Sequence, residues 1–99
     1  MSGSPADGAQ VDTASVPRFR RGIKLRQDAA RGGWVLLAPE KAFMLDAIAA
    51  EILQLVDGER AIEAICAQLA QKFAAPLDVI TGDVCAVMAD LARKGAVEL

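Results

Sequence analysis

The fold of this chain follows from one stretch, Trp34 to Leu69: WVLLAPEKAFMLDAIAAEILQLVDGERAIEAICAQL. It opens with an apolar run typical of a strand, turns at Pro39 and resumes an apolar run at Ala42–Leu45. Pro39 favours a turn because its ring fixes φ and because it lacks the N–H group that a central strand needs. Asp46 then supplies a helix N-cap, and Gly58 ends the helix that follows. The pattern predicts a β-hairpin and two helices, with no catalytic group inside them.

The segments on either side of this stretch complete the predicted architecture. Residues 23–27 alternate apolar and polar side chains, which is the period of a half-buried strand, and Gly32–Gly33 permit the hairpin turn that follows. We therefore predict an α+β fold, an N-terminal three-stranded antiparallel β-sheet followed by three α-helices, in an order typical of winged helix-turn-helix domains. The expected bounds are 23–27, 34–37 and 41–45 for the strands, 46–56, 60–73 and 78–94 for the helices, and 96–97 for a short last strand.

Composition predicts one small domain preceded by a tail. Of the 99 residues, 54% are hydrophobic but only 4% are aromatic, so a thin core must depend on aliphatic side chains. Residues 1–16 consist mainly of Gly, Ser, Ala, Pro and Asp, which bury too little apolar area to offset the entropy lost on ordering. We expect residues 1–16 to be a disordered tail and residues 17–99 to be the folded domain.

Several functional classes lack the residues that they require. The chain has no His, and Cys66 and Cys85 sit in apolar helical patterns, so we predict buried thiols in a reducing compartment, with no metal site and no cofactor. No Gly-rich phosphate loop is present, and no Ser or Cys stands beside a base, so we expect no catalytic residues and no enzyme. The lack of an 18-residue apolar run and of a secretory signal predicts no membrane partner and a cytoplasmic location.

Charge is distributed unevenly along the chain. Residues 17–31 hold six basic residues and one acidic residue, whereas residues 32–99 hold five basic and ten acidic residues. One interpretation is a solvated basic strand edge beside an acidic body, and the other is a docking surface for an acidic partner. The sequence leaves both interpretations open.

The predicted helix 78–94 has a wide uncharged arc. Spacing at 100° per residue places one apolar stripe beside a second uncharged stripe. One interpretation is that Ala-rich helices pack closely and cover the arc. The other is that the arc forms a groove wall on which a peptide lies. The first stripe is Ile80, Val84, Val87 and Leu91, and the second is Thr81, Cys85, Met88 and Ala92.

The ordered combination of these motifs resembles the PqqD family, small proteins of pyrroloquinoline quinone biosynthesis. The matching motifs are the hairpin LLAPEKAFMLD, the helix that runs into LVDGER, the next helix IEAICAQLAQKF and a helix that ends in ARKGAVEL. Together they cover roughly residues 18–99. One departure is Ala61, where the second helix of such proteins often opens with Thr or Ser, so we expect Asp57 or Glu59 to cap that helix.

The resemblance implies a peptide chaperone, also called a recognition element for ribosomally made, modified peptides. It implies that the precursor peptide, PqqA-like, adds as a strand beside the third strand and lies along the third helix. It also implies presentation to a radical S-adenosylmethionine enzyme, PqqE-like, which joins a Glu and a Tyr side chain within the peptide. Carried onto this chain, the peptide-binding residues are Lys41, Ala42, Phe43, Met44 and Leu45 on the strand, and Val84, Cys85, Val87, Met88 and Leu91 on the helix.

Three questions stay open at this point. Alternation does not say which of Phe43 and Met44 faces the core, because both are apolar. The oligomeric state is a monomer or a weak dimer, and exchange of strands between copies is one route to the dimer. The alternative function is a winged helix-turn-helix regulator that binds nucleic acid, but Asp78, Asp83 and Asp90 on the last helix favour no nucleic-acid partner, because phosphates repel carboxylates.

Overall fold

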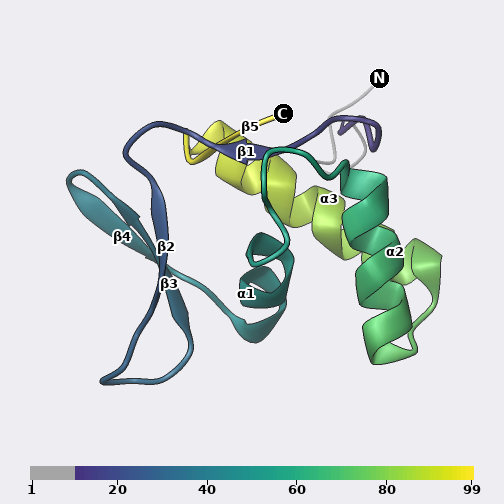
Figure 1. Ribbon diagram of the computed structural model, residues 1–99, viewed down its shortest axis with the longest axis horizontal. Coiled ribbons are helices and arrows are strands. Elements are labelled where there is room, and N and C mark those ends of the chain that lie inside the picture. Colours follow the sequence, from purple (N-terminus) through teal and green to yellow (C-terminus); the bar gives the residue numbers. More distant parts are fainter. Residues whose placement is uncertain (1–10) are drawn as a thin grey trace.

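A computed structural model describes residues 11–99, so most of the predicted tail, residues 1–10, lies outside the described residues. Figure 1 shows the sheet on one side of the molecule and the helices on the other. The order of elements confirms the predicted α+β class, whereas the winged helix-turn-helix label stays a prediction. No helix within residues 11–99 is long and apolar enough to cross a membrane. The elements are β1 Arg18–Phe19, β2 Lys24–Gln27, β3 Trp34–Ala38, β4 Lys41–Met44, α1 Ala47–Leu53, α2 Ile62–Phe73, α3 Leu77–Arg93 and β5 Val97–Glu98.

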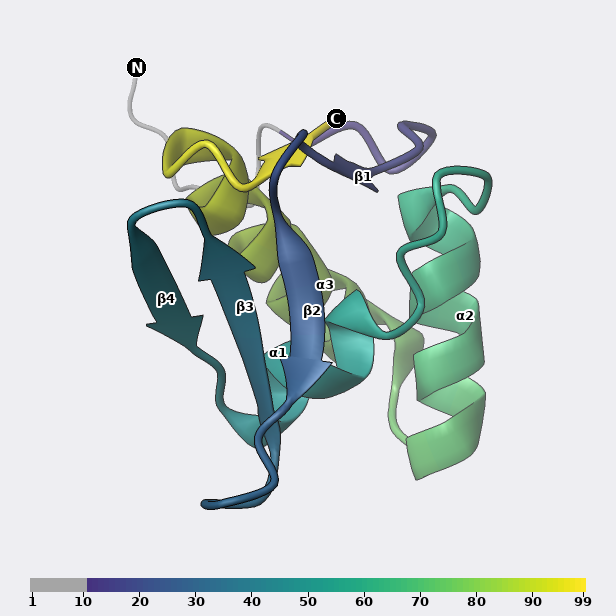
Figure 2. The same ribbon diagram turned by 60° about the vertical axis from the view of Figure 1, so that its left-hand side comes forward.

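Strands β2, β3 and β4 form an antiparallel sheet in that order, so β4 is one of its two edges. Leu25, Leu36 and Phe43 are directly opposite one another across the three strands. Leu36 is fully buried, and its two neighbours pack against the core. Since side chains alternate between the faces of a strand, this row defines the face that meets the helices. Figure 2 shows α1 and α3 behind that face.

A second, two-stranded sheet brings the two ends of the domain together. Phe19 of β1 is opposite Val97 of β5, and Arg18 is opposite Glu98. The sequence predicted a short last strand at 96–97, one residue from its observed position, but not its partner β1. Two residues are too few to show a period, so nothing in the local pattern could have indicated β1.

Helix α1 is shorter than predicted. It begins as expected, because the Asp46 carboxylate accepts a hydrogen bond from the Ala49 N–H group (2.8 Å). It ends at Leu53, and the next turn is tightened by hydrogen bonds from Leu55 to Ile52 and from Val56 to Leu53. Such three-residue spacing is common where a helix ends. Helices α1, α2 and α3 enclose the core with β3, and Leu36, Ile52, Leu53, Ile62, Ile65, Val84 and Met88 are almost completely buried.

The predicted side-chain cap of α2 is wrong. The N-cap residue is Ala61, which has no side chain able to accept a hydrogen bond. The Asp57 carboxylate instead accepts the N–H groups of Glu59 and Arg60 in the preceding turn, at 2.9 and 2.8 Å. These two hydrogen bonds, and then the Arg60 charge, lower the pKa of Asp57. Asp57 therefore stabilises the connection between α1 and α2. The N–H groups at the start of α2 bond with another segment.

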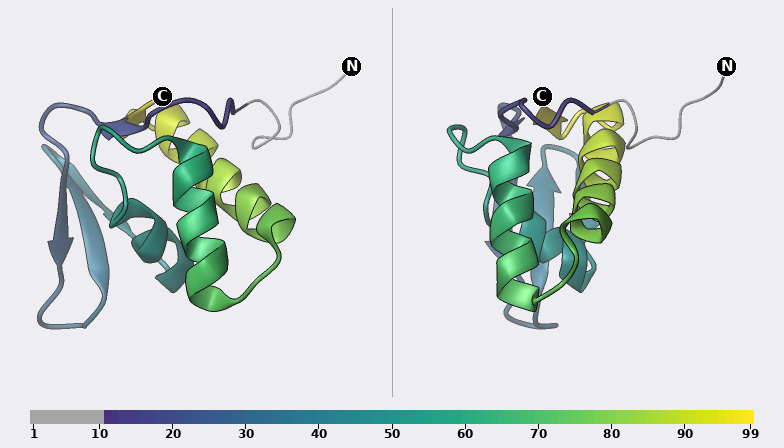
Figure 3. Two further views of the ribbon diagram at one scale, coloured as in Figure 1. Left: turned by 45° about the vertical axis from the view of Figure 1, so that its right-hand side comes forward. Right: turned by 90° about the vertical axis from the view of Figure 1, so that its right-hand side faces the viewer.

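That segment is residues 11–16, which the sequence placed in a disordered tail. The Ser15 carbonyl accepts a hydrogen bond from the Ile62 N–H group, and the Thr13 carbonyl accepts one from Glu63, both at 2.9 Å. The first N–H groups of a helix have no partner within the helix, so these backbone carbonyls replace a side-chain cap. Figure 3 shows the segment passing over the start of α2. Composition missed this role because a backbone carbonyl caps a helix whatever its side chain is.

Candidate functional site

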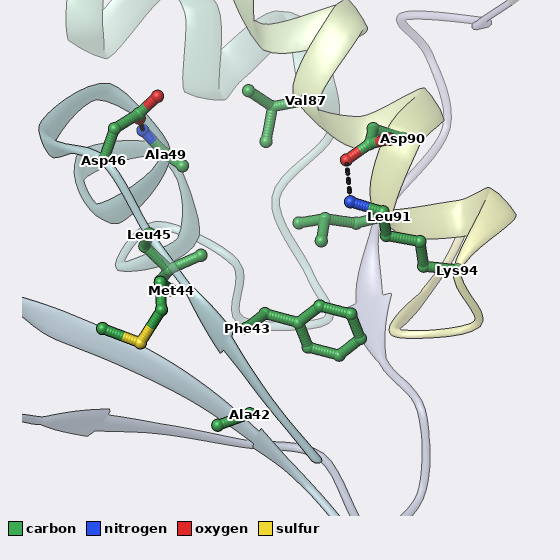
Figure 4. A pocket seen from close by; sticks show the side chains of 10 residues that line it. All are labelled: Ala42, Phe43, Met44, Leu45, Asp46, Ala49, Val87, Asp90, Leu91 and Lys94. Atoms are coloured by element: carbon green, nitrogen blue, oxygen red, sulfur yellow. Dashed lines mark hydrogen bonds and ion pairs between the residues drawn. The ribbon is translucent and has the colours of Figure 1, made fainter.

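A cavity of about 380 Å³ opens between β4 and α3. Figure 4 shows the side chains around it, with the strand on one side and the helix on the other. A cavity of this size falls within the range of ligand sites in proteins, about 300–1,000 Å³. The lining residues are Ala42, Phe43, Met44, Leu45, Asp46 and Ala49 on the strand side, and Val87, Asp90, Leu91 and Lys94 on the helix side. The cavity and its rim are called the β4–α3 groove below.

The outer edge of β4 offers backbone hydrogen-bonding groups beside this groove. Ala38 and Lys41 face each other across a two-residue turn, and the pair that closes such a turn bonds with each other. The bonding pairs alternate along an antiparallel ladder, so Ala42 and Met44 direct their N–H and C=O groups away from β3. No strand within residues 11–99 pairs with that edge of β4.

The structure answers which of Phe43 and Met44 faces the core. Phe43 is half-buried and packs against the core, whereas the side chain of Met44 lies on the opposite face and is 63% exposed. The ring of Phe43 projects toward α3 in Figure 4. The ammonium groups of Lys41 and Lys94 lie 5.0 and 6.0 Å from the ring centroid, within the range of cation–π attraction. Lys41 itself does not line the cavity.

The helix side differs from the sequence prediction. Val87 and Leu91, two of the helix residues predicted to bind the peptide, line the groove. Val84, Cys85 and Met88 do not line it, and they are 0%, 5% and 0% exposed in the core. Both apolar stripes of α3 are therefore covered to a large extent, and the groove touches only the border of the arc.

Burial also sets the chemistry of the two cysteines. Desolvation raises the pKa of the Cys66 thiol, and it raises the pKa of the Cys85 thiol beside it. A buried thiol with a raised pKa carries little thiolate, which is the reactive form. Cys85 is therefore a packing residue of the core.

Sequence reasoning missed the charged residues of the groove. The Asp90 carboxylate forms ion pairs with Lys94 and with Arg93, both at 2.9 Å. Asp90 and Lys94 are four residues apart, so they occupy the same side of α3 at the mouth of the groove. The signal was present in the sequence, because this pair flanks the apolar arc at Val87 and Leu91. An apolar pattern does not reveal this pair as part of a groove, because the opposite wall of the groove comes from β4.

No group of three or more His, Cys, Asp or Glu residues within residues 11–99 is arranged to hold a metal ion. The groove instead combines a free strand edge, an apolar floor and a charged rim. This combination suits a polymer that presents both backbone groups and alternating side chains, which is an extended peptide.

The comparison with known families identifies this architecture. The family model for coenzyme PQQ synthesis protein D (PqqD) matches residues 33–97. The chain belongs to the PqqD family. A relative from Bradyrhizobium diazoefficiens, named PqqA binding protein, is 48% identical over 85 residues, which are 86% of this chain and 82% of the relative.

Two solved structures share the PqqD fold of this chain. One is the solution structure of the PqqD part of Methylobacterium extorquens PqqCD, described as a functional and stand-alone recognition element for ribosomally synthesized, modified peptides. It matches with a TM-score of 0.81 and 37% identity, over 95% of this chain and 100% of that one. The other is a lasso peptide synthetase B1 in complex with its leader peptide, with a TM-score of 0.73 over 86% of this chain and 100% of that one. At 21% identity, this second likeness shows the fold alone.

Proposed function

We propose that this chain binds the precursor peptide of pyrroloquinoline quinone as a fourth strand on β4. The observation that carries the proposal is the free edge of β4 directly beside the β4–α3 groove. Ala42 and Met44 provide backbone donors and acceptors for an added strand. A peptide aligned on them turns every second side chain toward α3, because side chains alternate along a strand.

The groove supplies selectivity for those side chains. Phe43, Val87 and Leu91 form an apolar floor that favours aliphatic or aromatic residues of the peptide. The ion pair of Asp90 and Lys94 at the rim offers both a carboxylate and an ammonium group to polar residues. Backbone bonds thus provide sequence-independent affinity, and the groove provides the preference for one peptide.

The comparisons support this proposal at the level of the family. A relative that is 48% identical to this chain bears the name PqqA binding protein. The PqqD structure with a TM-score of 0.81 is described as a functional recognition element. A binding module of this kind leaves the chemistry to a separate enzyme and raises the local concentration of its peptide. In this proposal the enzyme is a radical S-adenosylmethionine enzyme that joins two side chains within the bound peptide.

The nucleic-acid alternative gains no support from the described surface. Asp78 and Asp83 on α3 are exposed, and exposed carboxylates repel the phosphate backbone. We therefore do not propose DNA or RNA as a partner.

A pair of proline variants tests the strand addition. Ala42→Pro removes an outward N–H group on β4 at an exposed position. The matched control is Gln27→Pro at the opposite edge of the sheet: Asp28 donates to Gly33 (2.9 Å), so by alternation the Gln27 N–H group points away from β3. Titration with the precursor peptide from the same genome should show at least tenfold weaker binding for Ala42→Pro and less than a twofold change for Gln27→Pro. Equal effects of the two variants would contradict addition to β4.

A further inference from the structure

The outer face of the three-stranded sheet has a composition that the peptide groove does not explain. Lys24, Leu37 and Ala42 form one row across the strands on this face. Arg26, Val35 and Met44 form the next row. Each row thus has a cation on β2 and apolar side chains on β3 and β4. We call this surface the outer sheet face.

The helices do not cover the outer sheet face. Figure 2 shows α1 and α3 on the opposite side of the sheet. Leu37 is 37% exposed and Met44 is 63% exposed, whereas Leu36, between the two rows on the other face of β3, is fully buried. Apolar side chains that remain exposed together, next to polar neighbours, are typical of a protein interaction surface.

The charge of this face defines the chemistry of its partner. Lys24 and Arg26 are the charged residues that the three strands place on this face, and these strands carry no Asp or Glu. Lys41 is two residues before Phe43 and therefore lies on the groove side. Lys24 and Arg26 form no ion pair within residues 11–99. The helices have the opposite balance, because α3 alone carries Asp78, Asp83 and Asp90. A complementary surface is therefore apolar at its centre and bordered by carboxylates.

The outer sheet face is also continuous with the bound peptide of the proposed function. A strand added to β4 alternates its side chains between the groove and the outer sheet face. Half of them therefore lie beside Ala42 and Met44 and continue the two rows by one more strand. The three strands present an area of roughly 15 Å by 15 Å, given a strand spacing of about 4.8 Å and a rise of about 3.3 Å per residue. A stable protein interface buries about 800 Å² on each partner, so this face alone is too small, and the peptide strand enlarges it.

We infer that the outer sheet face docks the enzyme that modifies the peptide, through an apolar, acid-bordered surface of that enzyme that contacts the sheet and the added peptide strand together. This inference rests on the proposed function. The enzyme then binds the peptide-loaded protein more tightly than the free protein, because the loaded form presents the larger surface. Ala42 and Met44 belong to both surfaces, because they line the groove and also lie in the two outer rows. Lys24, Arg26 and Leu37 belong to the outer sheet face alone.

Charge reversal on and off the outer sheet face distinguishes direct contact with the enzyme from long-range electrostatic attraction. The variant Lys24→Glu with Arg26→Glu changes two exposed cations of the outer sheet face. The matched control, Arg20→Glu with Arg21→Glu, makes the same change of net charge at two exposed positions outside the three strands. Leu37→Glu, with Leu77→Glu as its control, makes the same comparison for apolar contacts, since Leu77 is 54% exposed at the start of α3.

Two titrations are needed for each variant. The first measures the affinity for the precursor peptide, and the second measures the affinity of the purified radical S-adenosylmethionine enzyme for the protein saturated with peptide. We expect both outer-face variants to weaken enzyme binding at least tenfold with less than a twofold change in peptide affinity, and both controls to change enzyme binding less than threefold.

The outcomes distinguish this inference from the proposed function. Normal peptide binding with equal enzyme binding by all variants, or equal losses in variants and controls, overturns the docking surface alone. A wild-type protein that binds the peptide but not the enzyme also overturns the docking surface and leaves the proposed function intact. A wild-type protein that does not bind the peptide overturns the proposed function and the docking surface with it.

Discussion

The two sides of α3 differ in burial although they look alike in sequence. Val84 and Met88 are fully buried in the core, while Val87, one residue before Met88, lines the β4–α3 groove. All three are uncharged and lie within one arc of the helix. What separates the sides is the charged pair of Asp90 and Lys94, which follows Val87 at three and seven residues. The width of an apolar arc therefore does not locate a groove, whereas the ion pair at its border does.

A carboxylate placed on each side of α3 should have opposite effects on stability and binding. Met88→Asp should lower the free energy of unfolding by about 3–5 kcal/mol, because the core offers the charge no partner and little water. Guanidinium denaturation followed by circular dichroism measures the loss. Val87→Asp is the counterpart and should lower stability by less than about 1 kcal/mol, because its side chain borders open space. A Met88→Asp protein as stable as the wild type would contradict the assignment of Met88 to the core.

The same Val87→Asp variant should have its main effect on binding. A carboxylate on the groove floor loses water when the peptide covers it, so we expect at least a tenfold loss of peptide affinity, about 1.4 kcal/mol. Calorimetric titration with the precursor peptide measures the change. Ala86→Asp is the control, since Ala86 is exposed and outside the groove. Comparable losses for Ala86→Asp would point to charge repulsion and not to contact with the groove.

The sequence predicted the sheet and the order of helices because their signals are local. Alternation at Lys24–Gln27, the turn at Pro39 and the N-cap at Asp46 each act within a few residues. The site was predicted in part: the resemblance indicated β4 and α3, and the structure brings β4 together with Val87 and Leu91. The rest depends on contacts between distant segments, which no local pattern encodes.

The N-terminal segment is the clearest case of such a distant contact. Ser15 and Thr13 cap α2 through their carbonyl groups, which every residue type carries. Val11 adds an apolar contact to the core. Composition alone therefore could not distinguish these residues from a disordered tail. The burial of Val84, Cys85 and Met88 on α3 also depends on contacts with distant segments, which the local apolar pattern does not specify.

Removal of residues 11–16 should lower stability and leave the β4–α3 groove unchanged. A chain that begins at Pro17 loses both carbonyl partners of the first turn of α2, and we expect a loss of about 1–2 kcal/mol in stability. Thermal unfolding measures it, with a chain that begins at Val11 as the control. Since no residue of this segment lines the groove, peptide affinity at a temperature where the truncated chain is folded should stay within twofold. A chain from Pro17 as stable as the control would show that water replaces the carbonyls at no cost.

The smallest expected effect concerns the two carboxylates of the groove, Asp46 and Asp90. Asp46 caps α1 through its 2.8 Å hydrogen bond with the Ala49 N–H group, so Asp46→Ala should lower stability by about 1 kcal/mol. Asp90 pairs with Lys94 and Arg93 on a side chain that is 41% exposed, and exposed ion pairs contribute little, so Asp90→Ala should cost less than about 0.5 kcal/mol. Urea denaturation at low and high salt separates the two, because screening removes the ion pairs while the short hydrogen bond at the cap persists. A larger loss for Asp90→Ala than for Asp46→Ala would mean that the rim of the groove supports the helix, and the groove side of α3 would then be as structural as the core side.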